Sequence, residues 1–137
     1  MAATFAFEIV SPERLLLSRP VEMAVIPAAE GEMGVLPGHA PMILSLAGGM
    51  ISVHEGGQVT ERLFVMGGFA EVTPTRVTVL AEEALPVSEI TRAEAAKRVA
   101  EADAAYAAAV AAGDNEAREA AADRAIAARR METVAAG

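Results

Sequence analysis

The sequence predicts an α+β protein in which a β-domain is followed by an antiparallel helical hairpin. Up to Pro86, short apolar runs alternate with Gly and Pro, which is the pattern of short strands joined by turns. Residues 91–137 contain 21 alanines, and alanine is the strongest helix former. Gly113, Asp114 and Asn115 interrupt this alanine-rich stretch near its middle. We therefore predict two domains, residues 1–86 and residues 87–137.

Strands are expected wherever an apolar run of the first domain lies between turn residues. Alternation of buried-type residues is clearest at Phe5, Phe7 and Ile9. Glycine supplies positive φ and proline restricts φ, so Pro37-Gly38, Gly48-Gly49 and Gly67-Gly68 are predicted turns. Many short strands at this spacing indicate a β-sandwich or a barrel. The predicted strands are residues 4–10, 15–18, 21–26, 33–36, 42–46, 50–54, 58–65, 69–73 and 76–81.

Two helices are expected after residue 87, over about residues 91–111 and 116–134. Thr91 and Glu94 have the spacing of a capping box, and Ser88 is an alternative N-cap. A short loop between helices of equal length predicts an antiparallel hairpin. An alanine methyl contributes about 0.8 kcal/mol on burial, whereas a leucine or isoleucine side chain contributes roughly 1.5–3 kcal/mol. We therefore expect a locally stable but weakly docked hairpin that can act as a mobile element.

Composition excludes several classes of function. The net charge is −8, and residues 1–90 carry −7 of it, which disfavours binding to nucleic acid or to anionic lipid. The chain has no cysteine, so disulfides, cysteine-ligated zinc and thiol catalysis are excluded. We find no signal peptide and no uncharged apolar stretch of about 18 residues. Direct membrane insertion is therefore not expected, and any link to a membrane runs through a partner.

The sequence offers no recognisable catalytic centre. His39 and His54 are the only histidines, and their spacing suggests no metal site. No phosphate-binding loop or nucleophile elbow is present. We predict a non-catalytic assembly subunit without a metal site or a resident cofactor. A small hydrolase that uses Glu30, Glu32 or His39 is the alternative among enzymes.

Residues 30–42 are the most distinctive segment of the chain. The segment reads EGEMGVLPGHAPM. It is rich in turn formers and also carries apolar residues that we expect to be exposed. Loops of this composition often present a binding surface. The alternative is a rigid connection between two sheets.

The charged residues of the hairpin allow two interpretations. Seven basic residues are interleaved with eight acidic residues over residues 91–137. The favoured interpretation is a solvent face with ion pairs worth about 0.2–0.5 kcal/mol each. The alternative is a binding module for an anion such as a nucleotide, because the arginine fork suits phosphate.

Residues 30–41 closely resemble the signature of the epsilon subunit family of bacterial ATP synthases, whose mitochondrial counterpart is called delta. The family pattern reads Glu-Gly-x-hydrophobic-Gly-x-x-Pro-Gly-His-x-Pro, and this chain matches it throughout. Residues 7–12, 66–72 and 77–81 resemble the family as well. The resemblance covers essentially the whole chain, in order and at the expected length.

The resemblance implies a ten-stranded β-sandwich and a C-terminal two-helix domain. It implies a central-stalk subunit that binds the gamma subunit, stands on the ring of c subunits and couples proton-driven rotation to ATP synthesis. An extended hairpin would reach the alpha and beta subunits and inhibit ATP hydrolysis. The implied location is the cytoplasmic face of the bacterial inner membrane, as a peripheral part of the complex.

The resemblance also implies two sets of site residues. Some relatives bind ATP through an aliphatic-Asp-x-x-Arg-Ala motif, where this chain has Ser88, Glu89, Arg92 and Ala93. Because the first two positions depart from the motif, we expect weak ATP binding or none. The nucleotide candidates are Glu89, Arg92, Arg98 and Arg124. The residues implied for the c-ring contact are Glu30, Glu32, Met33, Gly34, Pro37, Gly38, His39, Ala40, Pro41 and Met42.

Overall fold

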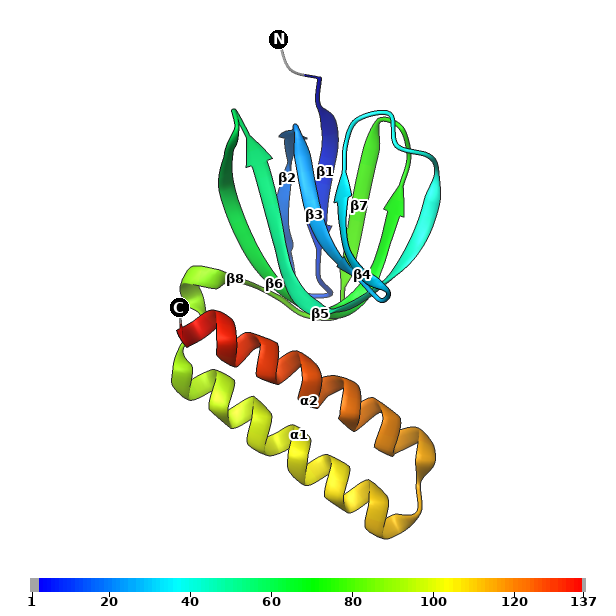
Figure 1. Cartoon of the computed structure of the whole chain (residues 1–137), viewed down its shortest axis with the longest axis vertical. Coiled ribbons are helices and arrows are strands. Elements are labelled where there is room, and N and C mark those ends of the chain that lie inside the picture. Colours follow the sequence, from blue (N-terminus) through cyan, green and yellow to red (C-terminus); the bar gives the residue numbers. More distant parts are fainter. Residues whose placement is uncertain (1–2, 137) are drawn as a thin grey trace. The chain divides into compact units, whose positions relative to one another are not determined.

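The computed structural model describes residues 3–136, and the chain divides into two compact units between Pro86 and Val87. Eight strands make up the first unit, and a short 3-10 helix and two α-helices make up the second (Figure 1). Residues 1, 2 and 137, at the outer ends of the two predicted domains, lie outside the described part of the chain. No helix of residues 3–136 is both long enough and apolar enough to cross a membrane.

The eight strands form one continuous sheet that folds over into two layers (Figure 1). The strand order is β2-β1-β7-β6-β5-β3-β4, and β8 pairs with β6. Neighbouring strands are antiparallel except β1 and β7, which are parallel. The strands are β1 (Phe5–Val10), β2 (Leu15–Val21), β3 (Met23–Ala28), β4 (Gly31–Val35), β5 (Met42–Glu55), β6 (Gln58–Val72), β7 (Arg76–Ala81) and β8 (Ala84–Pro86).

The long strands β5 and β6 each contribute to both layers of the sandwich. Counting these two strands once in each layer gives ten strand segments, as expected, and the β-sandwich is confirmed. The predicted turns at Gly48-Gly49 and Gly67-Gly68 are wrong, because β5 and β6 continue through them. Gly67 and Gly68 adopt φ of 111° and 133°, so β6 bends from one layer to the other while it stays paired with β5 on both sides of the bend.

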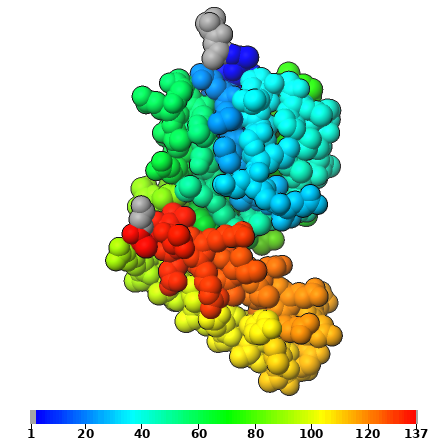
Figure 2. Space-filling view, viewed as in Figure 1, coloured from blue at the N-terminus to red at the C-terminus, as the bar shows by residue number. Residues whose placement is uncertain are grey.

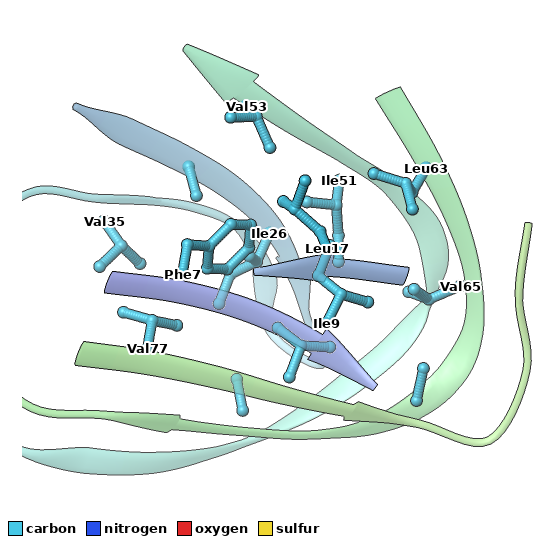
Figure 3. Close-up of a cluster of buried hydrophobic side chains, with 14 of the residues drawn as sticks. Phe7, Ile9, Leu17, Ile26, Val35, Ile51, Val53, Leu63, Val65 and Val77 are labelled. Carbon is cyan, nitrogen blue, oxygen red and sulfur yellow. The ribbon is translucent and has the colours of Figure 1, made fainter. Parts of the chain in front are cut away.

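The predicted alternation of β1 places its apolar side chains in the core between the two layers. Phe5, Phe7 and Ile9 are buried, and the Phe5 and Phe7 rings meet edge to face at 6.1 Å between centroids. Figure 3 shows Phe7 and Ile9 facing Ile26 and Ile51 from other strands. This core lies entirely within the first unit.

The second unit is the predicted helical hairpin, which is confirmed. It comprises a 3-10 helix (Val87–Glu89), α1 (Arg92–Ala112) and α2 (Asn115–Ala136). Thr91, not Ser88, is the N-cap of α1, since its Oγ1 accepts the Glu94 N–H at 3.1 Å. Gly113 ends α1 with φ of 69°, and Asp114 Oδ1 then caps α2 by accepting the Ala117 N–H at 3.0 Å.

Small side chains dominate the buried positions of the hairpin. Ala95, Ala102 and Ala109 recur at intervals of seven residues in α1, which keeps them on one helical face. Asp103 and Arg129 join the two helices at the surface through Nη2–carboxylate distances of 2.9 and 3.1 Å. Met131 is the one large side chain among the buried residues that the structure describes in these two helices, so each buried position removes little apolar area from water.

Candidate functional site

The structure divides residues 30–42 between two ends of the sandwich. Glu30 lies in the β3–β4 turn, and Glu32, Met33 and Gly34 lie in β4. The five residues of β4 span about 16 Å at roughly 3.3 Å per residue. Figure 1 shows the β3–β4 turn and the β4–β5 loop, which holds residues 36–41, at opposite ends of the unit.

This division separates the residues of the hydrolase alternative. Glu30 and His39 lie on connections at opposite ends of β4, so these side chains do not converge on one reactive centre. The part of the chain that the structure describes also holds no group of three or more His, Cys, Asp or Glu residues that could bind a metal ion.

β4 is an edge strand, because it pairs only with β3. Val35 is buried and Met33 packs against the core, whereas Glu32 and Gly34 alternate to the exposed face. Charged residues on an edge oppose uncontrolled pairing with another strand. Glu30 and Glu32 therefore form an exposed carboxylate pair beside Gly31, available to a partner with basic or polar groups.

The β4–β5 loop is anchored to the β6–β7 turn by a backbone hydrogen bond. Gly38 adopts φ of 81°, and its N–H donates to the Pro74 carbonyl at 2.8 Å. His39 is half-buried beside it, with Nδ1 at 3.4 Å from the Ala40 carbonyl oxygen. The segment from β4 into the start of β5, coloured cyan, lies on the surface of the sandwich (Figure 2). This loop thus presents its residues in a defined backbone conformation.

An apolar row crosses the outer face of the β2-β1-β7-β6-β5 layer, and only its Ile43 end lies next to this loop. Strand pairing places Leu15 opposite Val10, Val10 opposite Leu80, and Leu80 opposite Phe69. Ile43, the second residue of β5, lies diagonally next to Phe69 on the same face. The exposed fractions of Leu15, Leu80, Phe69 and Ile43 are 57%, 56%, 56% and 73%.

The apolar row (Val10, Leu15, Ile43, Phe69 and Leu80) is an exposed surface that sequence reasoning missed. An antiparallel layer with one face in solvent normally alternates apolar and polar residues. Leu15, Leu80 and Phe69 violate this alternation on the solvent side. The unbroken apolar runs at residues 15–17 and 79–81 were the signal that could have revealed the row.

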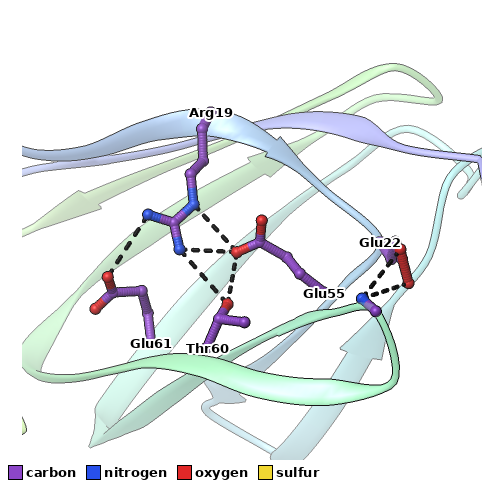
Figure 4. A network of polar contacts seen from close by, with 6 residues as sticks. Arg19, Glu22, Glu55, Thr60 and Glu61 are labelled. Atoms are coloured by element: carbon purple, nitrogen blue, oxygen red, sulfur yellow. Dashed lines mark hydrogen bonds and ion pairs between the residues drawn. The ribbon is translucent and has the colours of Figure 1, made fainter.

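A polar network at the β5–β6 connection joins the β5–β6 hairpin to Arg19 of β2 and to Glu22, which follows β2 (Figure 4). Arg19 Nη2 lies 2.7 Å from Glu55 Oε1, and Thr60 Oγ1 donates to the same oxygen at 2.5 Å. Glu22 accepts the Gly56 N–H at 3.1 and 3.2 Å. These contacts are satisfied within the sandwich, so we assign the network to stability.

The pKa of Glu55 lies below its ordinary value, first because Thr60 donates a hydrogen bond to the carboxylate and next because Arg19 does. Because the pKa is lower in the folded state, ionised Glu55 stabilises the fold at pH values above the unfolded-state pKa. This contribution is lost as pH falls through the folded-state pKa. We expect Glu55→Gln to lower the free energy of unfolding by less than about 1 kcal/mol at neutral pH, because the site is partly exposed. The difference between variant and wild type in urea titrations should shrink as pH falls through the folded-state pKa of Glu55, and a difference that does not change with pH contradicts this origin.

The nucleotide candidates occupy separate parts of the hairpin. Arg92 Nη2 donates to the Ala136 carbonyl at 3.2 Å, which places Arg92 level with the end of α2. Arg124 lies twelve residues before Ala136 in α2, or about 18 Å along the helix axis. Arg98 Nε donates to Glu94 at 3.2 Å, and Glu89 lies in the 3-10 helix. The ion pairs agree with the favoured solvent-face interpretation, and weak ATP binding or none stays a prediction.

Comparison with known proteins covers both units of the chain. A family model for the β-sandwich domain of the ATP synthase delta/epsilon chain matches residues 4–87. An ATP synthase epsilon chain of Granulibacter bethesdensis is 66% identical over 107 residues, which are 78% of each chain. An epsilon chain of Paramagnetospirillum magneticum is 54% identical over 102 residues, covering 73% of this chain and 77% of that one.

A solved structure extends the similarity to the helical unit. A chain in the cryo-EM structure of the Euglena gracilis mitochondrial ATP synthase, which includes the c-ring, superposes with a TM-score of 0.76 at 28% identity. The match covers 97% of this chain and 82% of the Euglena chain. The chain therefore belongs to the ATP synthase delta/epsilon family and is an epsilon-type, non-catalytic subunit of that complex.

Proposed function

We propose that this epsilon-type subunit joins the gamma subunit to the c-ring in the central stalk and transmits rotation between them. The apolar row on the sandwich carries the proposal. Four of its five side chains are more than half exposed, whereas outside the row only Leu36 and Val59 are exposed among the large apolar residues described in this unit. Contiguous exposed apolar surface of this kind marks a protein–protein interface.

We assign the gamma subunit to the apolar row and to the adjoining β4–β5 loop. Ile43 follows directly on Met42, so the loop and the row form one continuous surface. The row is rimmed by Glu8 and Glu71 on the same outer face, and Arg76 pairs with Glu8. A partner that presents apolar side chains surrounded by basic groups fits this face.

We assign the c-ring to the carboxylate end of β4. Glu30 and Glu32 are exposed there, and Gly34 leaves the edge open to the approach of another backbone. In this proposal the predicted c-ring surface over residues 30–42 becomes two contacts at opposite ends of β4, with the c-ring at Glu30–Gly34 and gamma at Pro37–Met42. A subunit that binds the c-ring at one end and the gamma subunit at the other can transmit rotation between them.

We assign regulation to the helical unit. Its two helices pack on each other through alanines and are joined at the surface by the Asp103–Arg129 ion pair, so the hairpin can move as one unit. In this proposal the extended hairpin reaches the alpha and beta subunits and slows ATP hydrolysis. We propose that the chain lies, as a peripheral part of the complex, on the cytoplasmic face of the bacterial inner membrane.

Titration of a catalytic head that lacks its epsilon chain tests this division of labour. We expect the full chain to bind with 1:1 stoichiometry to the head and to lower its rate of ATP hydrolysis. A fragment ending at Pro86 retains the complete sandwich core and should bind with similar affinity without lowering the rate. Binding by co-elution and phosphate release are the two measurements.

Each result has a distinct consequence. A fragment that fails to co-elute with the head contradicts the assignment of gamma binding to the sandwich. Equal inhibition by the fragment and by the full chain contradicts the regulatory role of the hairpin.

A further inference from the structure

The β6–β7 turn, residues 73–76, is closed by its own hydrogen bonds. The Thr73 N–H donates to the Arg76 carbonyl at 2.8 Å, and the Arg76 N–H donates to Thr73 Oγ1 at 3.0 Å. Thr73 Oγ1 in turn donates to the Arg76 carbonyl at 3.0 Å. One threonine hydroxyl therefore fixes the geometry of this turn through both its donor and its acceptor.

The same turn reaches two other segments of the sandwich. The Pro74 carbonyl accepts the Gly38 N–H of the β4–β5 loop at 2.8 Å, and the Thr75 carbonyl accepts the Ala6 N–H of β1 at 2.9 Å. The Arg76 guanidinium pairs with Glu8 of β1. These contacts bind the turn to β1 on one side and the loop to the turn on the other.

The hydrogen bond from the Gly38 N–H to the Pro74 carbonyl holds the loop at a residue with positive φ. Gly38 has φ of 81°, in the left-handed region, and nothing lies within 4 Å of the position of a Cβ there. Open space around the residue means that packing does not restrain it, so the backbone hydrogen bond is the restraint on that side of the loop.

We propose that the β6–β7 turn is a positioning element for the binding surface, with Thr73 as the residue that sets it. Thr73 shapes the turn, the turn aims the Pro74 carbonyl at Gly38, and this bond holds the His39 loop in the conformation that the partner binds. The proposal rests on the assignment of the β4–β5 loop to the gamma contact. It adds one exposed residue, Pro74, to the boundary of that contact.

Thr73→Val tests the proposal because it keeps the side-chain shape and removes both hydroxyl contacts. We expect amide hydrogen exchange at Gly38 to accelerate about tenfold or more in the isolated chain. Affinity for purified gamma subunit, measured by calorimetry, should fall by about tenfold. Thr73→Ser restores the hydroxyl and should return both quantities to near the wild-type values.

Thr75→Val is the matched control, since it makes the same change two residues along while the Thr75 backbone carbonyl stays in place. We expect it to leave Gly38 exchange and gamma affinity unchanged. Unchanged Gly38 exchange in Thr73→Val overturns the proposal, and so does faster exchange with unaltered gamma affinity. Failure of the wild-type chain to bind gamma refutes the proposed function instead, while Gly38 exchange still decides whether the turn holds the loop.

Discussion

Replacing Gly68 by alanine is expected to lower the free energy of unfolding of the sandwich by at least about 3 kcal/mol. A Cβ at this position would lie 2.1 Å from the Leu80 carbonyl oxygen and 2.9 Å from the Ala81 Cα. Both atoms belong to the backbone of β7, so no side-chain rotation relieves the overlap. The φ of 133° adds backbone strain, because L-residues rarely adopt it.

Thermal unfolding of the two-unit chain, followed by circular dichroism in the region of β-structure, measures this effect. For a unit of this size, 3 kcal/mol corresponds to a fall in Tm of about 12 °C or more. Gly31→Ala is the control, because Gly31 has a similar φ of 138° with nothing within 4 Å of a Cβ. We expect about 1–2 kcal/mol for the control, and equal losses for the two variants would show that strain alone, without overlap, matters.

Replacing Phe69 by aspartate is expected to weaken binding to the gamma subunit by at least about 30-fold, or 2 kcal/mol. Phe69 lies in the middle of the apolar row, between Leu80 on β7 and the start of β5. In the proposed interface its ring is removed from water, so an aspartate there loses the apolar contact and adds an unpaired charge.

The folded chain itself should tolerate this change. The side chain of Phe69 is 56% exposed and points away from the sandwich core, so we expect a loss of stability below about 1 kcal/mol. Val59→Asp is the matched control, because Val59 is also exposed but lies in the first half of β6, away from the row. It should leave gamma affinity unchanged.

Glu32→Lys separates the two proposed partners. It reverses the charge at the carboxylate end of β4 and should weaken association with the c-ring while preserving gamma binding. Phe69→Asp should show the opposite pattern, with loss of gamma binding. Equal effects of the two substitutions on both partners would contradict the assignment of separate surfaces.

The sequence predicted the elements of both units because their local signals are strong. The alternation of Phe5, Phe7 and Ile9 specifies one buried face of β1, and the structure buries all three. Alanine content, Thr91 and Gly113 specify where the helices form and where α1 begins and ends. Each of these signals depends on a residue and its neighbours within a few positions, which is the range over which sequence patterns are informative.

Gly48-Gly49 and Gly67-Gly68 show where local signals fail. Adjacent glycines are compatible with a turn and with a bent strand, and only the pairing of β5 with β6 across the bend selects the strand. The short β8 was not predicted, because three residues are too few to show an alternation of apolar and polar residues. Its formation depends on pairing with β6, which lies elsewhere in the chain.

By itself, the sequence determined the α+β class, the change of structure at Pro86, the helical hairpin and the family signature over residues 30–41. Only the tertiary structure divided that signature between two ends of β4, joined Gly38 to Pro74, and aligned Val10, Leu15, Phe69 and Leu80 in one row. The physical reason is the separation along the chain between the residues that interact. Helix propensity, caps and alternation act between near neighbours, whereas a binding surface is made by strand register between segments far apart in the chain.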